Sequence, residues 1–323
     1  MSFELSLNIG ATKSKKVETN NLYDTLIVGG GPAGLNAALY AKRKGLDVGI
    51  LTEKIGGQVL DTFVVENYLG FKNISGEGLM QEFEQQIKEY DIPITEEVKV
   101  VGIKNEEYKE LIINNGDTYK AKTIILATGT VPRMLNVPGE KQFYGKGVSY
   151  CAICDSSLYV QKEVIIAGGG NAAIGAAIDL SRIASKVKVV HRSEFRADKI
   201  LLDKLNKLNN VEIYLQTSIL EIKGQNKMTH IVALDKKSNK NIEIEAEGLF
   251  IEIGHIPKTE FVKEVIKLDN KNEIIVNSKA ETSEQGIYAA GDVANVDYKQ
   301  IIIAAAEGAK AALSANEYIN KRK

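Results

Sequence analysis

The chain has 323 residues, with 41 basic and 42 acidic side chains and a net charge of -1. This balance gives no sign of a nucleic-acid, polyanionic or charged membrane partner, and the length favours two domains. No apolar run approaches a membrane span, and residues 1–20 lack the basic-then-apolar order of a signal peptide, so we expect a cytoplasmic protein. Residues 1–20 are predicted to form an edge strand or a loose tail, and no function is assigned to them.

A dinucleotide-binding unit is predicted near the N-terminus. An apolar run at 26–28 is typical of a buried strand, and it leads directly into the motif Gly-x-Gly-x-x-Gly at 29–34. A helix is predicted over 35–44 and a second strand over 47–51, and Glu53 stands 19 residues after the last glycine. In such units the glycines let a pyrophosphate approach the backbone at the helix N-terminus, and the acid binds ribose hydroxyls.

Further elements of the same domain are predicted to follow. We expect a helix over 78–90, a small antiparallel meander over 98–119 and a buried strand over 122–126. The last strand ends in Ala127-Thr128-Gly129, which is either a plain strand-to-loop turn or a backbone crossing beside a cofactor. Prolines after this point predict a linker near 129–135.

The only two cysteines of the chain stand as Cys151-x-x-Cys154, and Asp155 follows directly. Two thiols at this spacing can form an inert disulfide, bind a metal or work as a redox-active dithiol. Zinc is disfavoured because it needs four ligands, and the three histidines, at 191, 230 and 255, show no paired spacing. In a reducing compartment a lone Cys-x-x-Cys is more often catalytic, and the acid can move the proton that thiol–disulfide exchange requires. We therefore predict a redox-active dithiol.

A second dinucleotide-binding unit is predicted after the dithiol. A strand over 164–167 leads into Gly-x-Gly-x-x-Ala at 168–173, then a helix to about 183 and a strand over 187–190. This second strand ends not in an acid but in His191-Arg192, with Arg196 close by. Basic residues at this place suit the extra phosphate of NADP, and a solvated basic loop is the alternative. Two nucleotide sites and a dithiol together predict electron flow between two cofactors.

The C-terminal part is predicted to return to the first domain. Strands are expected over 211–253, and His255 in a Gly–Pro turn is more often structural than a base. A strand over 287–290 ends in Gly291-Asp292, and an acid at this edge can hold the polyol of a flavin. Lys299-Gln300 then opens an alanine-rich helix that we expect to pack on the first domain.

Taken together, these residues resemble the low-molecular-weight thioredoxin reductase family, including the flavoprotein part of bacterial alkyl hydroperoxide reductase. The resemblance covers nearly all of residues 22–320, and its combination of motifs is highly specific. The motifs are Gly29-Gly30-Gly31-Pro32-Ala33-Gly34, Gly56-Gly57-Gln58, Glu66-Asn67-Tyr68, Ala127-Thr128-Gly129, Cys151-Ala152-Ile153-Cys154-Asp155, Gly168-Gly169-Gly170-Asn171 and Ala289-Ala290-Gly291-Asp292. The tail from Tyr298 to Lys310 is especially similar to the hydroperoxide-reductase branch.

The resemblance implies an α/β fold with two Rossmann-like, three-layer dinucleotide-binding domains, the second inserted in the first. Residues 1–130 and 258–323 would bind FAD, and residues 131–257 would bind the pyridine nucleotide and carry the dithiol. The implied protein is a homodimeric thioredoxin-disulfide reductase, which passes electrons from NADPH through FAD and the dithiol to thioredoxin or a thioredoxin-like protein. The sequence lacks the thioredoxin-like N-terminal domains of the hydroperoxide-reductase branch, so we expect a separate partner protein.

The resemblance also implies the roles of individual residues, and no metal is expected. Cys154 would face the flavin and form the charge-transfer thiolate, Cys151 would attack the disulfide of the partner, and Asp155 would donate the proton. The residues implied to contact FAD are Gly29, Gly31, Pro32, Ala33, Gly34, Glu53, Gly57, Gln58, Asn67, Ala127, Thr128, Gly129, Gly291, Asp292, Gln300 and Ile301. The residues implied to contact NADPH are Gly168, Gly170, Asn171, Ala173, His191, Arg192 and Arg196.

Three departures from the family pattern bear on the electron donor. Ala172 replaces a usual Ser or Thr, Gly175 replaces a usual Glu, and the phosphate clamp at 191–196 is one residue shorter than usual and lacks its second Arg. Each lost charged contact to phosphate weakens binding by roughly 1.5–3 kcal/mol. The alternatives are NADH or ferredoxin as donor, a peroxiredoxin system as acceptor, and a non-catalytic nucleotide-sensing protein on the same fold. The sequence leaves the donor, the partner and the role of residues 1–20 open.

Overall fold

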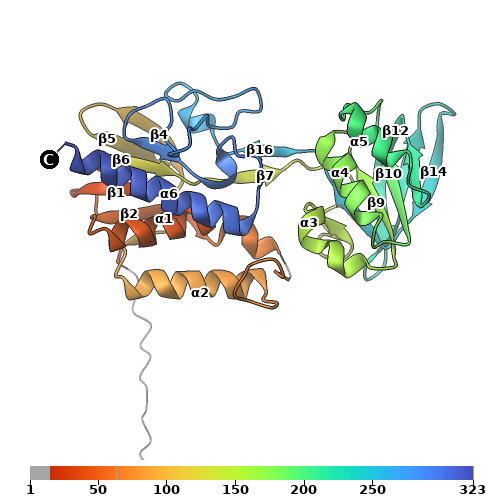
Figure 1. Cartoon of the computed structure of the whole chain (residues 1–323), viewed down its shortest axis with the longest axis horizontal. Coiled ribbons are helices and arrows are strands. Elements are labelled where there is room, and N and C mark those ends of the chain that lie inside the picture. Colours follow the sequence, from red (N-terminus) through yellow and green to blue (C-terminus); the bar gives the residue numbers. More distant parts are fainter. Residues whose placement is uncertain (1–14, 63, 323) are drawn as a thin grey trace, which may run out of the picture. The chain divides into compact units, whose positions relative to one another are not determined.

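The computed structural model describes residues 15–62 and 64–322 (Figure 1). The chain divides into two compact units. The first unit consists of Met1–Leu60, Glu77–Gly129 and Pro257–Lys323, and the second consists of Asp61–Gly76 and Thr130–Ile256.

The segment Asp61–Gly76 groups with the second unit, whereas the expected boundaries placed it in the first. One contact that holds it there is the Tyr144 hydroxyl, which donates a hydrogen bond to the Asp61 carbonyl oxygen at 3.1 Å. Burial raises the pKa of Tyr144 to about 12, so this hydroxyl stays a donor at neutral pH. The assignment of the two units to FAD and to the pyridine nucleotide stays a prediction.

The first unit is built on a mixed sheet with the strand order β3-β2-β1-β6-β5-β4, and β17 pairs with β6. Its described strands are β1 (Leu22–Gly30), β2 (Val48–Ile55), β3 (Ile94–Thr95), β4 (Val100–Asn105), β5 (Lys109–Ile113), β6 (Thr118–Leu126) and β17 (Ile287–Ala289). β1 runs parallel to β2 and β6, while β5 pairs antiparallel with β4 and β6. The apolar runs of β1 and β6 are buried, as expected for central parallel strands.

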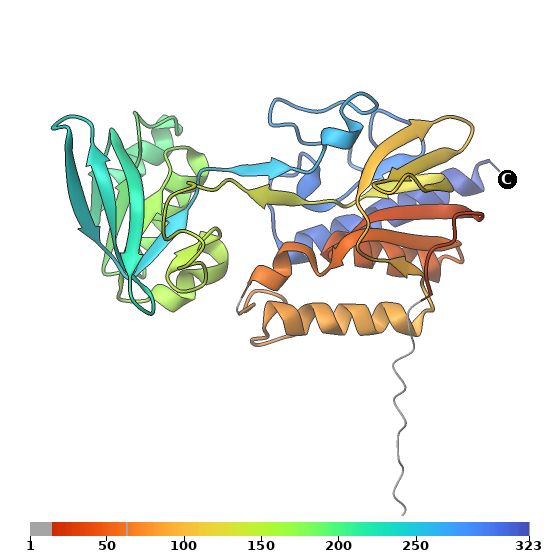
Figure 2. The same ribbon diagram turned by 180° about the vertical axis from the view of Figure 1, so that it is seen from behind.

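The helical elements of this unit include α1 (Pro32–Arg43) and α6 (Ile301–Asn320), which pack against each other (Figures 1 and 2). The others are α2 (Gly76–Glu89), η1 (Gly57–Asp61), η3 (Glu260–Val262) and η4 (Gly291–Val293). α1 begins with Pro32, whose ring fixes a helical φ and whose missing N–H costs nothing at this position. The two helices are in close contact at Gly308, where a Cβ atom would lie 1.9 Å from the carbonyl oxygen of Ala33. Only glycine fits at this position without a shift of the backbone.

The second unit is built on a parallel sheet with the strand order β11-β10-β9-β15-β8. These strands are β8 (Val148–Ser149), β9 (Glu163–Ala167), β10 (Lys186–Val190), β11 (Val211–Tyr214) and β15 (Gly248–Ile251). An antiparallel sheet holds β12 (Thr217–Gly224), β13 (Met228–Asp235) and β14 (Lys240–Glu245), and β7 (Thr130–Pro132) pairs with β16 (His255–Pro257). The helical elements are α3 (Ala152–Asp155), η2 (Ser156–Tyr159), α4 (Asn171–Leu180) and α5 (Lys199–Leu205).

The second unit has three layers because alternate side chains of β9 point to opposite faces. Val164 and Ile166 pack with residues of α4, whereas Ile165 and Ala167 pack with residues of the antiparallel sheet. The parallel sheet is therefore covered on both faces. The expected α/β fold with two Rossmann-like, dinucleotide-binding domains is confirmed.

Most predicted elements are found, with shifted ends. The meander expected over 98–119 is formed by β4, β5 and the start of β6. The helix expected to reach about 183 ends at Leu180, and turns follow it.

Of residues 1–20, only 15–20 are described: the Lys15 carbonyl accepts a hydrogen bond from Ile94 N, and Val17 is buried. The prediction for residues 1–14 lies outside the described residues. Within residues 15–62 and 64–322, no helix is both long and apolar enough to cross a membrane.

The α1–α6 contact generates a stability prediction. Gly308→Ala should destabilise the protein by about 1–3 kcal/mol, because the new methyl group meets rigid backbone. Gly175→Ala on α4 is the matched control, since a Cβ there meets nothing within 4 Å. That change should be neutral or stabilising by roughly 0.5–1 kcal/mol, because glycine is unfavourable inside a helix. Denaturant unfolding followed by circular dichroism measures both, and equal midpoints for the two variants would contradict the packing described.

Candidate active site

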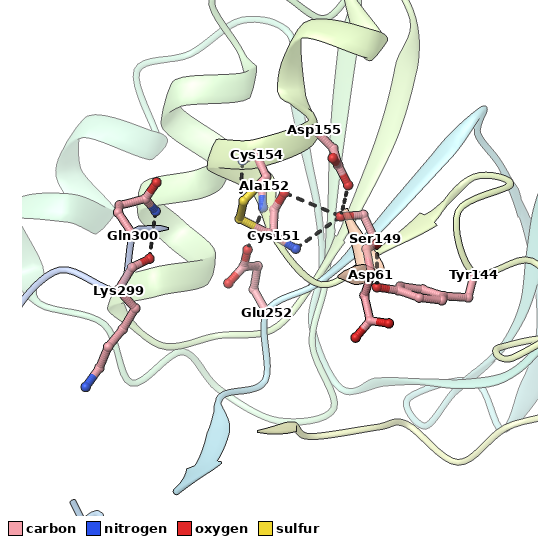
Figure 3. The surroundings of a disulfide bond; sticks show 10 residues. All are labelled: Asp61, Tyr144, Ser149, Cys151, Ala152, Cys154, Asp155, Glu252, Lys299 and Gln300. Carbon is pink, nitrogen blue, oxygen red and sulfur yellow. Dashed lines mark hydrogen bonds between the residues drawn. A yellow bond between two sulfur atoms is a disulfide. The ribbon is translucent and has the colours of Figure 1, made fainter. Parts of the chain in front are cut away.

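The dithiol segment, residues 150–155, follows β8, and its two cysteines are joined in a disulfide (Figure 3). Cys151 is the N-cap of α3 and Cys154 lies within that single helical turn, so their Cα atoms are 5.3 Å apart. The backbone N–H of Cys154 donates to Cys151 Sγ at 3.2 Å. A hydrogen-bond donor in this position is suited to stabilise negative charge on the Cys151 sulfur.

Asp155, at the end of α3, is held by a serine that the sequence analysis missed. Ser149 Oγ donates to Asp155 Oδ2 at 2.6 Å and accepts from Cys151 N at 3.1 Å. Burial raises the pKa of Asp155, and the Ser149 hydrogen bond opposes part of that rise. The carboxyl group therefore keeps a proton to a higher pH than an ordinary aspartate. The available sequence signal was a hydroxyl residue two positions before Cys151.

A second carboxyl group, also missed by the sequence analysis, lies on the other side of the dithiol segment (Figure 3). Glu252 directly follows β15, and its Oε1 accepts a hydrogen bond from Ala152 N at 3.1 Å. Ala152 is one of the two residues between the cysteines. Burial raises the pKa of Glu252, and the Ala152 hydrogen bond opposes that rise. Its signal in the sequence was an acid ending the apolar run Leu249-Phe250-Ile251.

The first glycine loop has the geometry of a pyrophosphate cradle. A Cβ on Gly29 would lie 2.2 Å from the Ala127 carbonyl oxygen, and one on Gly34 would lie 1.9 Å from the Gly29 oxygen. These two glycines are required by close packing of strand, turn and helix. Gly31 differs, because a Cβ there would meet nothing within 4 Å. Its open backbone stands at the start of α1, where helix N–H groups favour an anion.

Several of the other residues implied to contact FAD gather at this loop. Gly57 lies beside it, since a Cβ there would be 3.5 Å from Gly31 Cα. Gly291 packs against Ala33 on α1, with 2.9 Å between its ideal Cβ position and the Ala33 Cβ. Asp292 is therefore carried to the same end of α1, and burial raises the pKa of its carboxyl group while Lys299 lowers it. The structure thus brings together Gly29, Gly31, Pro32, Ala33, Gly34, Gly57, Ala127, Gly291 and Asp292.

Glu53, near the end of β2, is partnered in this structure. Its Oε2 lies 3.0 Å from Lys258 Nζ, and both side chains are exposed. An exposed pair of this kind is worth at most about 1 kcal/mol, so the carboxylate can exchange it for ribose hydroxyls.

The remaining residues implied to contact FAD have separate positions. Thr128 Oγ1 donates to the Lys258 carbonyl oxygen, Gln300 is the N-cap of α6, and Ile301 begins that helix. Gln58 is in η1, and Gly129 accepts a hydrogen bond from Lys258 N. Asn67 belongs to the segment 61–76 of the second unit, so its contact with FAD stays a prediction.

The second glycine loop repeats the pattern of the first. A Cβ on Gly168 would lie 2.4 Å from the Glu252 carbonyl oxygen and 2.6 Å from Ala173 Cβ, whereas one on Gly170 would meet nothing within 4 Å. Ala173 is fully buried and takes the place of the third glycine. Gly170 is thus the open backbone position at the start of α4.

The basic segment after β10 folds against this loop. The His191 ring lies on Gly169, where a Cβ would be 2.4 Å from it, and Arg196 N donates to the Gly169 carbonyl oxygen at 2.8 Å. Burial and the charges of Arg196 and Arg192 lower the pKa of His191, which favours the neutral imidazole. Both arginines are exposed. Asn171 begins α4 and is bonded through its side chain to Asp198. No group of three or more metal-binding side chains occurs among the described residues.

Comparisons with known proteins identify the family of the chain. Residues 23–308 match the family model for pyridine nucleotide-disulphide oxidoreductases. The F component of the alkyl hydroperoxide reductase of Pseudomonas aeruginosa is 42% identical over 322 residues, which are 98% of this chain and 62% of that protein. An NADH dehydrogenase of Bacillus subtilis is 40% identical over 298 residues, covering 92% of this chain and 58% of that protein. The chain thus spans about three fifths of the length of these curated relatives.

Solved structures of thioredoxin reductases are similar over almost their whole length. The enzyme of Streptococcus pyogenes is 37% identical with a TM-score of 0.87, covering 94% of this chain and 99% of that one. The enzyme of T. acidophilum is 38% identical with a TM-score of 0.64, covering 93% of this chain and 99% of that one. The chain therefore belongs to the pyridine nucleotide-disulphide oxidoreductase family, with the fold of the low-molecular-weight thioredoxin reductases.

Proposed function

We propose that the protein is an FAD-dependent disulfide reductase, which passes electrons from NADPH to the Cys151–Cys154 dithiol and from there to thioredoxin or a thioredoxin-like protein. The observation that carries the proposal is the disulfide itself, because its thiolate-stabilising N–H and its protonatable acid, Asp155, are both in place. A purely structural disulfide needs neither group.

FAD fits the first unit, which has an open backbone at Gly31, the start of α1 behind it and the Asp292 carboxyl group at the same helix end. When bound there, FAD supplies the means to accept a hydride equivalent and to release two electrons to a disulfide. The open backbone at Gly170 and the basic residues His191, Arg192 and Arg196 support a nicotinamide dinucleotide in the second unit. The first unit is accordingly proposed as the FAD domain and the second as the pyridine-nucleotide domain.

The chain's own residues account for transfer to a partner. Cys151 as a thiolate attacks one sulfur of the partner's disulfide and forms a mixed disulfide, and the other partner sulfur leaves. Asp155, which keeps its proton to a raised pH, supplies the proton to that leaving sulfur. Cys154 then attacks Cys151 Sγ, and the second partner sulfur leaves and takes up the proton that Cys154 loses. This restores the internal disulfide and releases the partner as a dithiol.

A peroxiredoxin-type partner is the second candidate, and one observation favours it. The curated relatives include the F components of alkyl hydroperoxide reductases at 40–42% identity over 98% of this chain. Turnover with a peroxiredoxin system but not with thioredoxin would select this alternative. A homodimer and a cytoplasmic location are part of the same proposal.

The donor is tested by mixing oxidised, FAD-loaded protein anaerobically with NADPH or NADH and following the flavin absorbance. NADPH should bleach the flavin, because Arg192 and Arg196 offer positive charge for its extra phosphate. The Arg192→Ala/Arg196→Ala double variant should raise the apparent KM for NADPH at least ~10-fold, the loss expected for a charged contact, and leave NADH unchanged.

Arg182→Ala is the matched control, since this exposed arginine of the same unit forms an exposed ion pair with Asp179. Equal KM values for NADPH in the double variant and the control would overturn the assignment of the clamp. Bleaching by reduced ferredoxin but by neither nicotinamide would overturn the choice of donor.

The role of Asp155 generates a prediction on pH dependence. Asp155→Asn should lower the rate of partner reduction by roughly 10²–10⁴, the usual contribution of a general acid. Because the acid works in its protonated form, activity falls as pH rises through its pKa. The Ser149 hydrogen bond lowers this pKa, so Ser149→Ala should move the alkaline fall of the kcat/KM profile to higher pH.

Ser157→Ala, at an exposed neighbouring serine, should leave the profile in place. A profile that does not move in Ser149→Ala, or that moves to lower pH, would remove Asp155 from the role of acid.

A further inference from the structure

Glu252 is a partly buried carboxyl group for which the proposed transfer steps have no use. It touches the dithiol segment at Ala152 N, at 3.1 Å, between the two cysteines (Figure 3). Figure 3 shows its side chain reaching toward this segment, on the side away from Ser149 and Asp155. Two acids therefore belong to the surroundings of the disulfide: Asp155 at the end of α3 and Glu252 bonded to Ala152 N. Only Asp155 has a role in the proposed exchange with a partner.

The position of Glu252 is fixed by the sheet. β15 lies between β9 and β8, and Glu252 N continues the pairing by donating to the Ala167 carbonyl oxygen at 2.8 Å. The next residue on the neighbouring strand, Gly168, has no side chain, and a Cβ there would lie 2.4 Å from the Glu252 carbonyl oxygen. The carboxyl group is thus held on rigid backbone, between the second glycine loop and the dithiol segment.

The neighbours of Glu252 include titratable groups of α3 and the residue that follows β7. α3 contributes Asp155, which is held by Ser149, together with Cys154. β7 is followed by Arg133, whose backbone N–H donates to the Gly254 carbonyl oxygen. Cδ and Nε of Arg133 lie 3.7 and 3.8 Å from the ideal Cβ position of that glycine, two residues after Glu252. Burial is the largest cause of the raised pKa of Glu252, and the Ala152 N–H opposes it. A new negative charge on the dithiol would therefore be felt strongly by this group.

We propose that Glu252 takes up one proton from solvent when the Cys151–Cys154 disulfide is reduced. This inference rests on the proposed function, in which the dithiol is redox-active. Two electrons, from the nicotinamide donor in the cell or from dithiothreitol in the test, break the S–S bond and leave one thiol and one thiolate. The thiol binds one proton and Glu252 binds a second, so the reduced site carries one negative charge instead of two.

The direction of the effect follows from the two states of the dithiol. In the oxidised protein the pKa of Glu252 is already above that of an ordinary glutamate, and the thiolate of the reduced protein raises it further. Below the oxidised-state pKa the group is protonated in both states and takes up nothing. Between the two pKa values it binds a proton on reduction. Above both it stays charged and makes the dithiol harder to reduce.

The experiment measures the equilibrium between the disulfide and dithiothreitol in the FAD-loaded protein from acidic to alkaline pH. Each sample is quenched with acid and labelled with a maleimide, and mass spectrometry counts the thiols. The count is unambiguous because the chain has two cysteines only. Glu252→Gln keeps an oxygen that can accept from Ala152 N and removes the titration. Glu247→Gln, at an exposed carboxylate of the same unit, is the matched control.

The curves of the exchange equilibrium against pH should be parallel for wild type and Glu252→Gln at acidic pH. At higher pH they should diverge, and the disulfide of Glu252→Gln should then be the easier to reduce. In the pH range where the two curves diverge, the equilibrium constant for exchange with dithiothreitol should depend on pH more steeply in wild type than in Glu252→Gln. The additional change is up to tenfold per pH unit, which corresponds to about 30 mV in the reduction potential of a two-electron couple. The Glu247→Gln curve should follow wild type. Parallel curves for wild type and Glu252→Gln throughout would overturn the inference and leave the proposed function standing. A disulfide that dithiothreitol does not reduce at any pH would overturn both.

If Glu252→Gln does not fold, infrared difference spectra of the reduced and oxidised protein decide the question. A carboxylic acid band should appear on reduction in wild type and persist in Asp155→Asn, because Glu252 is then the group that is protonated. Absence of that band from Asp155→Asn would overturn the inference.

Discussion

The carboxyl ends of three neighbouring parallel strands meet at one edge of the second unit, and this arrangement places its chemistry. β8 leads into the dithiol segment, β15 leads into Glu252, and β9 leads into the glycine loop that begins at Gly168. Because parallel strands end at a common edge, three segments up to about a hundred residues apart in sequence are held side by side by backbone hydrogen bonds. The acids beside the disulfide are consequently fixed by the sheet, and their burial follows from the layers that cover it.

The first unit uses the same physical arrangement for a different purpose. β1, β6 and β17 are neighbours, and they lead into the first glycine loop, Ala127 and Gly291. Here the close approaches are between backbone atoms, so the edge presents N–H groups and open glycine backbone instead of acids and sulfur. Such a surface suits a pyrophosphate, whereas the edge of the second unit adds groups that move protons and electrons.

The sequence was most informative where local patterns carry the structure. The glycine spacings at 29–34 and 168–173 predicted both loops. In such a βαβ unit each glycine allows a tight turn, the close approach of a ligand to the backbone, or close packing of helix and strand. The Cys-x-x-Cys spacing predicted sulfurs close enough to bond, because one helical turn joins them.

Side-chain contacts outside the motifs could not be predicted in this way. Ser149 has no motif that marks it as a partner of Asp155, although it lies only six residues before it. Glu252 meets Ala152 across a sequence separation of 100 residues, through strand order alone. The Glu53–Lys258 pair and the grouping of 61–76 with the second unit likewise arise from tertiary packing.

The most direct test of the account is a count of thiols after reduction by a nicotinamide. Oxidised, FAD-loaded protein is mixed anaerobically with NADPH, quenched with acid and labelled with a maleimide for mass spectrometry. Two labels per chain are expected, at Cys151 and Cys154, and none when NADPH is omitted. A flavin that is bleached by NADPH while both cysteines stay unlabelled would contradict it, because the disulfide would then lie outside the path of the electrons.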